Sequence, residues 1–415
     1  MFPMVSLFLL AALALGEERS VYRVAFGSCL NQLKTSKALR AAAASSADVF
    51  VFLGDNTYHD MPHCGIPWNH EKCDARQWLR FFRRVGTYVF RRLCYGAAIE
   101  DSLRRKDDYE ILGKNHIVPF LQKSPGTQVL ATYDDHDFGR DDSGEDYEYK
   151  HDSRAQFSKF WGALTQRNYE KHTTGIYDFF EVERLNLKIQ FVVLDTRFAR
   201  TAWREAKYTD RFLNLLHLYF SKNATCPTET QRNFISDEPQ MLSEEQWLWL
   251  ESILQRPAHI RIIASSIQVF RPYDGAESWS LMPKERQKLL RLVSSASGQS
   301  LFISGDVHYG ELAHFSRGLG SEGSQNFFEL TSSGLTETWP CSHANPHRIQ
   351  GPFHNPNFGI IDIFSEDTIR LQLRDENNNI VINHTIHNKG LDFCRNEEDP
   401  SSSSSSRSGG NNVCS

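Results

Sequence analysis

The sequence predicts an α/β fold in which a pair of mixed β-sheets is covered by helices. Short runs rich in Val, Ile, Leu and Phe alternate with helix-like segments along most of the chain, and this alternation is typical of α/β proteins. The C-terminal part instead alternates apolar and polar residues, which indicates antiparallel strands. Two mixed sheets flanked by helices accommodate both patterns, and one large domain is the simplest division of the chain.

Each predicted strand is an apolar run that ends in small or polar residues. In chain order these runs are 22–29 (YRVAFGSC), 48–55 (DVFVFLGD), 127–137 (TQVLATYDDHD), 187–197 (LKIQFVVLDTR), 259–270 (HIRIIASSIQVF) and 300–308 (SLFISGDVH). Helix-like segments lie between them at 36–44, 75–93, 153–164 and 243–255. The last begins with a capping box, because Ser243 precedes Gln246 by three residues. Residues 358–387, with the turn DENNN, predict an antiparallel hairpin.

Two stretches resemble insertions. Residues 199–240 are polar and irregular, and residues 340–358 are rich in His, Pro and Asn. Long loops of this kind usually form binding surfaces or are disordered. We expect four polar residues of the second stretch to be solvated: Asn345, His347, His354 and Asn357. Residues 397–415 are rich in Ser and Gly and predict a disordered tail, so the folded domain is expected to span residues 17–396.

Residues 1–16 predict a cleaved secretory signal. Val5 to Leu15 is almost wholly apolar, but a helix that spans a bilayer needs about 20 such residues. Small residues stand at Ala14 and Gly16, where a signal peptidase reads, although the segment lacks a basic start. A buried first strand is the less favoured alternative. We therefore expect a mature start near Glu17, a secreted or secretory-lumen location, and no stable membrane insertion.

The cysteines and the charge balance constrain the compartment and the partners. Eight cysteines should mostly be paired in an oxidising compartment. Cys64 and Cys73 are placed for a local bridge, although connectivity cannot be read from sequence. Sequons at Asn223 and Asn383 fit the same compartment and predict a glycoprotein. The formal net charge of -5 provides no positive field that would favour nucleic acid.

Reactive side chains collect where the predicted strands end, which is where ligands bind in α/β sheets. The chain carries there Gly27-Ser28-Cys29, Gly54-Asp55-Asn56 followed by Tyr58, Asp134-Asp135-His136-Asp137, and Gly305-Asp306-Val307-His308. A lone aspartate at a strand end serves about as often in a turn or a cap. The run at 134–137 is different, because its three carboxylates, crowded around an imidazole within four residues, repel one another unless a cation neutralises them.

The donor types indicate two unlike metal sites side by side. Carboxylates suit hard cations, whereas thiolate and imidazole suit transition metals. A phenolate beside a thiolate, as Tyr58 and Cys29 would supply, favours trivalent iron over zinc. Two adjacent cations can hold the oxygens of a phosphoryl group and lower the pKa of a bridging water that attacks phosphorus in line. His136 is placed to protonate the departing oxygen, and its alternative role is that of a core histidine bonded to a backbone carbonyl.

Six stretches, in order FGSC, FLGDNTY, YDDHD, VVLDTR, SSIQVF and SGDVH, resemble the PhoD-like (alkaline phosphatase D) branch of the metallophosphoesterase superfamily. They span roughly Ala25 to His308. The resemblance implies a four-layer α/β/β/α sandwich and a phosphomonoesterase or phosphodiesterase that acts on small-molecule, nucleotide or lipid phosphoesters. It also implies Fe³⁺ and Ca²⁺ as cofactors, with other divalent metals such as Zn²⁺ or Mn²⁺ as the alternative.

The resemblance also implies roles for individual residues. By motif position the iron ligands are Cys29, Asp55, Tyr58 and His308, with Asp55 as the bridging carboxylate, and the ligands of the second cation are Asp135 and Asp306. His136 takes the place of a histidine that approaches the phosphoryl group without binding metal. The chain departs from the bacterial pattern at Asn56, where an aromatic residue is usual, and at His59 and Asp137, where glutamate is common.

Other functions remain open at this point. Cys29 could be the nucleophile of a thiol hydrolase with a histidine as base, although that would leave the aspartates unexplained. A non-catalytic carrier of metal or phosphate is a further alternative. Arg197 could clamp a phosphate or form a structural ion pair with Asp195 or another carboxylate.

Overall fold

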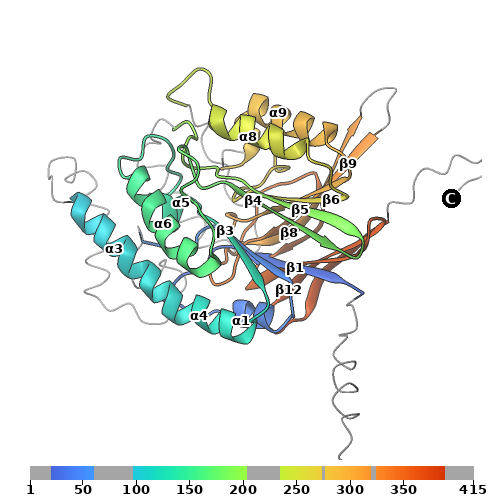
Figure 1. Ribbon diagram of the computed structural model, residues 1–415, viewed down its shortest axis with the longest axis horizontal. Coiled ribbons are helices and arrows are strands. Elements are labelled where there is room, and N and C mark those ends of the chain that lie inside the picture. The colour runs from blue at the N-terminus through green and yellow to red at the C-terminus, as the bar shows by residue number, and fades with distance from the viewer. Residues whose placement is uncertain (1–19, 60–96, 203–233, 273–275, 319–323, 388–415) are drawn as a thin grey trace, which may run out of the picture.

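The computed structural model describes residues 20–59, 97–202, 234–272, 276–318 and 324–387 (Figure 1). The expected signal segment, the helix expected at 75–93, the local bridge expected between Cys64 and Cys73, and the C-terminal tail lie outside these residues. Within the described residues no helix is both long enough and apolar enough to cross a membrane.

The first sheet joins strands from both ends of the chain. Among the described residues it has six strands, in the order β13-β12-β11-β1-β2-β3. The three N-terminal strands run parallel to one another, and β11 pairs antiparallel with β1. The strands are β1 (Tyr22–Gly27), β2 (Val49–Leu53), β3 (Gln128–Thr132), β11 (Asn357–Ser365), β12 (Thr368–Asp375) and β13 (Ile380–His387).

The second sheet comes from the middle of the chain. In the part of the chain that the structure describes, it has seven strands, in the order β10-β8-β9-β7-β6-β5-β4. The central strands β5, β6, β7 and β9 run parallel, and antiparallel strands flank them on both sides. The strands are β4 (Asp178–Arg184), β5 (Leu187–Val193), β6 (Ile260–Ala264), β7 (Gln299–Ser304), β8 (Gly310–Gly318), β9 (Ser324–Ser332) and β10 (Arg348–Phe353).

Helices cover the outer faces of both sheets, as Figure 1 shows. One apolar cluster joins the first sheet to α1, α3, α4 and α6, and another joins the second sheet to α8 and α9. A third cluster fills the space between the two sheets. The helices are α1 (Lys37–Ala43), α3 (Ala97–Leu112), α4 (Val118–Lys123), α5 (Asp135–Phe138), α6 (Lys150–Thr165), α8 (Glu244–Leu254) and α9 (Pro283–Ser295). The expected four-layer α/β/β/α sandwich with mixed sheets is therefore confirmed.

Strand β2 illustrates why these sequences form buried central strands. Its alternate residues Val49, Val51 and Leu53 belong to the cluster between the sheets, while Phe50 and Phe52 belong to the cluster beneath the helices. Side chains on a strand point alternately to its two faces, so a strand covered on both faces must be apolar throughout. Burial of each such side chain contributes about 1.5–3 kcal/mol, which holds the polar end of the strand in one place.

Two local expectations are corrected. Ser243 caps α8 by accepting a hydrogen bond from the Gln246 backbone (3.1 Å), but the Gln246 side chain does not complete a capping box. It pairs instead with both backbone polar groups of Asp195, accepting from the N–H and donating to the carbonyl oxygen, each at 2.9 Å.

The expected irregular loop at 340–358 also contains strand β10, which pairs with β8. Asn345 and Asn357 within it are buried rather than solvated. Asn345 donates to Glu311 at 2.7 Å, and Asn357 accepts from the Ser332 hydroxyl at 2.9 Å. Tertiary hydrogen bonds thus order a segment whose composition suggested a loop.

Candidate metal centre

The carboxyl ends of parallel strands from both sheets meet at one edge of the sandwich. Cys29 follows β1, Asp55 follows β2, Asp135 follows β3, and Asp306 and His308 follow β7. A bridge between Ser28 and Ser333 ties the ends of the two sheets together. Side chains that are far apart in sequence are therefore delivered to a common point.

The backbone adopts unusual conformations at four of these residues. Positive φ angles occur at Cys29 (59°), Asp55 (51°), Asp306 (72°) and His308 (59°). This left-handed region is uncommon for residues other than glycine, and such strain gathers at functional sites that the surrounding fold holds in place. The chain thus turns abruptly after β1, β2 and β7, at the residues that carry these donor side chains.

Cys29, Asp55 and His308 form one group of potential ligands. One ligand atom from each lies within 4.8 Å of the other two, and all three residues are buried. The Cys29 Sγ lies 3.6 Å from Asp55 Oδ2, and the Tyr58 hydroxyl donates to the same oxygen at 3.2 Å. The thiol, carboxylate, imidazole and phenol expected as ligands of one cation therefore do converge.

The remaining predicted residues form groups that adjoin the first. Asp55, Asp135 and His136 make up a second group, and Asp134, Asp135 and Asp306 a third, by the same 4.8 Å spacing. Asp55 is common to the first two groups and Asp135 to the last two. The structure thus brings together all seven predicted residues, with Asp55 between the two halves. Their individual roles as ligands or catalytic groups remain predictions.

Negative charge at the centre is poorly compensated by the protein itself. Burial, and next to it the carboxylate of Asp135, raises the pKa of Asp55 well above its usual value, and burial with the neighbouring Asp134 does the same for Asp306. Burial raises the pKa of the Cys29 thiol to about 12. Bound cations would displace these protons and compensate the negative charge.

The carboxylate oxygens of the centre test whether its donor set fits metal ions. Asp134 Oδ2 is buried and has no hydrogen-bond partner among the described residues, and Asp135 Oδ1 is buried there with no hydrogen bond but with a long ion pair to Arg197 Nη2, at 3.8 Å. A buried polar atom without a partner is costly, and oxygen donors of this type are what hard cations prefer. The donor set therefore fits a metal centre with a hard-cation side at Asp135 and a softer side at Cys29 and His308.

His308 is oriented by the loop behind it. Its Nδ1 donates to the Glu337 carbonyl oxygen at 3.1 Å, which leaves Nε2 free to face the centre. The ring lies against Trp339, with ring centroids 4.8 Å apart. Burial lowers the pKa of His308, which favours the neutral imidazole that binds metal.

His136 lies beside the Asp55 carboxylate. Its backbone N–H donates to Asp55 Oδ1 at 3.2 Å, and its ring packs on Tyr58 with centroids 4.5 Å apart. The residue is 5% exposed. It is thus within reach of groups bound at the centre, and it also has a ligand atom near Asp55 and Asp135.

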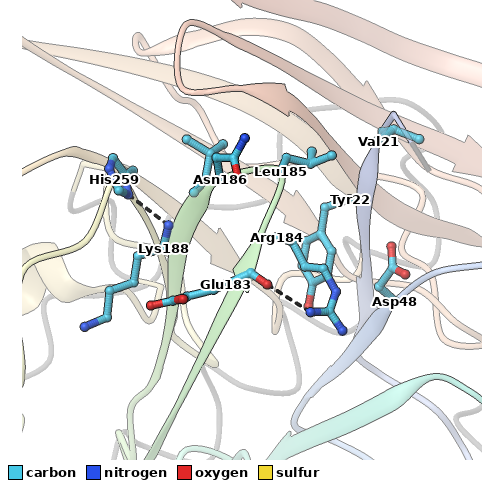
Figure 2. Close-up of a pocket in the computed structure, with 10 residues that line it drawn as sticks. Val21, Tyr22, Asp48, Glu183, Arg184, Leu185, Asn186, Lys188 and His259 are labelled. Carbon is cyan, nitrogen blue, oxygen red and sulfur yellow. Dashed lines mark hydrogen bonds between the residues drawn. The ribbon is translucent and has the colours of Figure 1, made fainter. Parts of the chain in front are cut away.

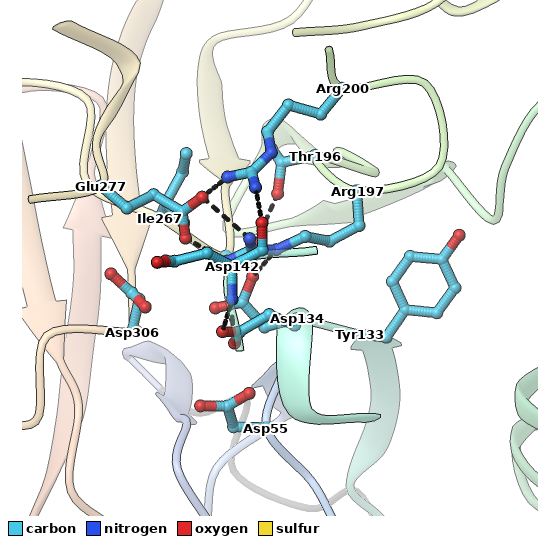
Figure 3. Close-up of polar contacts among 12 residues, drawn as sticks. Asp55, Tyr133, Asp134, Asp142, Thr196, Arg197, Arg200, Ile267, Glu277 and Asp306 are labelled. Carbon is cyan, nitrogen blue, oxygen red and sulfur yellow. Dashed lines mark hydrogen bonds and ion pairs between the residues drawn. The ribbon is translucent and has the colours of Figure 1, made fainter. Parts of the chain in front are cut away.

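A buried ion-pair network supports the acidic side, as Figure 3 shows. Arg197 donates to Asp134 at 2.5 Å and, through both terminal nitrogens, to Glu277 at 2.9 and 2.5 Å. Arg200 also pairs with Glu277. Asp195 instead accepts from the backbone N–H groups of Arg197 and Phe198. Arg197 therefore forms structural ion pairs, and its partners are carboxylates other than Asp195.

Sequence reasoning did not find Glu277 or Asp142, which form a further acidic group with Asp135. Glu277 has no strand-end pattern around it. Asp142 shares a backbone feature with four of the predicted ligands, since its φ is 60°, but a positive φ is not visible in a sequence. Asp134 was visible in the YDDHD run.

A pocket of about 720 Å³ lies elsewhere and contains none of the predicted ligands (Figure 2). It is lined by the start of β1, including Tyr22, by the turn between β4 and β5, including Asn186, and by the start of β5, including Lys188. These segments belong to the opposite ends of strands β1 and β5 from the metal centre. Its size alone does not make it the reactive site, because the donor groups collect at the other edge.

Comparisons with known proteins agree with this geometry. A sequence model described as PhoD-like phosphatase matches residues 127–379, which is more than half of the chain. A solved structure titled "Structure of PhoD" is 16% identical, covers 89% of this chain and 69% of its own, and superposes with a TM-score of 0.54. No curated protein matches.

Two further solved structures are more distant. GAP50, described as the anchor in the inner membrane complex of Plasmodium, is 10% identical, with a TM-score of 0.44 and coverage of 89% of both chains. Purple acid phosphatase PPD1 from yellow lupin (Lupinus luteus) seeds is also 10% identical, with a TM-score of 0.44 and coverage of 90% of this chain and 54% of its own. Because the family match spans most of the sandwich, the chain belongs to the PhoD-like phosphatase family and is a phosphoesterase.

Proposed function

We propose that this protein is a secreted, metal-dependent phosphoric ester hydrolase in which water attacks phosphorus in line between two cations. One observation carries the proposal. Asp55 is shared by a group containing Cys29 and His308 and by a group containing Asp135 and His136. A carboxylate in that position is suited to bridge two ions, and two ions side by side can hold both the attacking and the leaving oxygen of an in-line displacement at phosphorus.

The residues divide between the two cations by donor chemistry. Cys29, Tyr58 and His308 would hold Fe³⁺ with Asp55, because thiolate, phenolate and imidazole suit a transition metal. Asp135 and Asp306 would hold Ca²⁺, because both offer only carboxylate oxygens. When bound, the cations would supply Lewis acidity at the phosphoryl oxygens and lower the pKa of the attacking water.

The chain's own groups perform the remaining tasks. His136 is assigned to donate a proton to the departing oxygen or to steady the phosphoryl oxygens. Its position supports this, because its backbone is tied to Asp55 and its ring is confined by Tyr58. General acid catalysis of this kind contributes about 10²–10⁴-fold in rate. Substrates are expected to be small-molecule, nucleotide or lipid phosphoesters.

A thiol hydrolase is disfavoured by the environment of Cys29. A nucleophilic cysteine needs a lowered pKa and access to substrate, whereas burial raises the pKa of this thiol to about 12 and its exposed fraction is 0%. Cys29→Ser distinguishes the two functions. Loss of a ligand should remove iron along with activity, whereas loss of a nucleophile should abolish turnover with the metals retained.

The proposed activity is tested with p-nitrophenyl phosphate and bis-p-nitrophenyl phosphate. The purified chain should hydrolyse at least one of them, and Asp306→Asn should lose most of that activity. Asp367→Asn is the matched control, because Asp367 is an exposed aspartate in the turn between β11 and β12. Turnover of neither ester by a chain with metals bound would instead favour a non-catalytic carrier.

Secretion is the remaining part of the proposal. Cys341 is buried and is expected to be paired in a disulfide, which would suit an oxidising compartment. Asn383 of the second sequon is exposed on β13, where a glycan could be attached. Expression in a secretory host tests both points. Mass spectrometry should find a mature start near Glu17 and a glycan on Asn383, and an intracellular product that retains its first residues would contradict secretion.

A further inference from the structure

Two turns that carry predicted ligands lie in direct contact. Strands β2 and β3 are parallel neighbours, with Leu53 opposite Thr132, so the turns that follow them lie side by side. Gly54 makes the contact possible, because a Cβ at this position would lie 2.5 Å from the Asp134 Cβ. The φ of Gly54 is 98°, which also favours glycine.

The Asp137 carboxylate joins the two turns. Its Oδ1 accepts from the backbone N–H groups of Asp55 (3.3 Å) and Asp134 (2.6 Å). Its Oδ2 accepts from the backbone N–H (3.2 Å) and the side-chain amide (2.7 Å) of Asn56. The same Asn56 amide nitrogen donates to the Thr132 carbonyl at 2.9 Å. Asp137 and Asn56 are both 0% exposed.

The connection is reciprocal. Asp137 accepts from the backbone of Asp55, and Asp55 in turn accepts from the backbone of His136 at 3.2 Å. Each turn therefore offers a carboxylate to the backbone of the other. This exchange holds Asp55 in its left-handed conformation (φ 51°) and fixes its distance from Asp135 and His136.

We propose that Asp137 and Asn56 form a clamp that sets the spacing between the two halves of the metal centre. Neither residue contacts metal or substrate in this account, so both are positioning residues. The two positions are departures from the bacterial pattern, and the structure shows that they are direct partners. The inference rests on the proposed metal centre and adds the device that shapes it.

The clamp depends on both carboxylate oxygens of Asp137 being hydrogen-bond acceptors. Asp137→Asn keeps the size of the side chain but turns one acceptor oxygen into an NH₂ group. That group would face N–H donors from Asp55 and Asp134 or from Asn56, so two hydrogen bonds would be lost on one side. Loss of groups that orient metal ligands typically costs about 10- to 100-fold in metal affinity or activity.

The test measures metal retention in the full-length protein as purified. Asp137→Asn should lose its metals to EDTA about 10-fold faster or more than the wild type, as followed by elemental analysis, and its kcat should fall. Glu329→Gln is the matched control. Glu329 is likewise 0% exposed and accepts from two backbone N–H groups, those of Val269 (2.7 Å) and Phe270 (2.8 Å), but contacts no predicted ligand. It should retain metal like the wild type.

Asn56→Ala provides a second, milder variant. It removes one donor to Asp137 but keeps the carboxylate and its three backbone partners, and it should speed metal loss in the same direction by a smaller factor. Equal metal retention in Asp137→Asn and the wild type, or equal losses in Asp137→Asn and Glu329→Gln, would overturn the clamp.

The same experiment separates the clamp from the proposed function. A wild-type chain that holds metals but hydrolyses neither ester contradicts the proposed function alone, and faster metal loss from Asp137→Asn would still support the clamp. A wild-type chain that holds no metal overturns both.

Discussion

Replacement of Arg197 by methionine should destabilise the protein strongly. The Arg197 side chain is 0% exposed, and its partners Asp134 and Glu277 are 1% and 3% exposed. Its three nitrogens make contacts of 2.5, 2.9 and 2.5 Å with these two carboxylates. Methionine fills a similar volume but carries no charge. Asp134 and Glu277 would therefore stay buried without the positive charge that Arg197 supplies to both. Removing one partner of a buried ion pair costs about 3–5 kcal/mol.

An exposed pair of the same chemistry is the control. Arg256 binds Glu181 through two nitrogens, at 2.9 and 2.5 Å, but 47% of its side chain is exposed. Water already solvates these charges, so Arg256→Met should have little effect on stability. The two variants thus differ in burial rather than in the type of interaction.

The assay is urea denaturation of both variants and the wild type, followed by tryptophan fluorescence. Arg197→Met should lower the free energy of unfolding by about 3–5 kcal/mol, and Glu277→Gln combined with it should cost less than the sum of the two single changes, because the residues share one interaction. Equal stabilities of Arg197→Met and Arg256→Met would refute the claim that Arg197 neutralises the acidic side of the centre.

Three further predictions concern the turn, the acid and a buried carboxylate. Gly54→Ala should destabilise the fold in thermal melts, because its Cβ would collide with Asp134, whereas Gly126→Ala, with nothing within 4 Å, should not; equal melting temperatures would contradict the close approach of the turns. His136→Ala should lower kcat by about 10²–10⁴-fold with metal content unchanged, and loss of metal in this variant would instead make His136 a ligand. Burial raises the pKa of Glu329 to about 7, so the native state holds a proton that the unfolded chain releases near its usual value of 4.5. Stability should therefore fall as pH rises from about 4.5 to 7, by up to about 1.4 kcal/mol per pH unit. Glu329→Gln should flatten that slope in denaturation series, and an unchanged slope would contradict the assignment.

The strand ends could be predicted because they are local features. Each apolar run that stops at Gly54, Asp135 or Asp306 contains its own strand signal and its own donor, and parallel strands bring such ends to one edge. The prediction needed no knowledge of which strands are neighbours. It placed Cys29 and His308 at the same edge although they are separated by most of the chain.

The supporting contacts could not be predicted because they depend on distant pairs. Arg197 meets Asp134 from 63 positions away and Glu277 from 80. Gln246 fits a capping box by local pattern, yet its side chain pairs with Asp195, 51 positions away. In both cases a tertiary partner outcompetes the local one, and single-sequence patterns do not contain that competition. Strand β10 was missed for the same reason, since its pairing with β8 orders a polar segment.

The central claim is that Cys29, Asp55, Tyr58, Asp135, Asp306 and His308 hold two adjacent cations, and elemental analysis with a visible absorption spectrum tests it most directly. The wild-type chain as purified should contain iron and calcium in similar amounts and absorb visible light through its thiolate and phenolate ligands. Cys29→Ser should lose iron and much of that absorption. A colourless wild-type protein that contains only zinc, or that hydrolyses phosphoesters with no metal bound, would contradict the account.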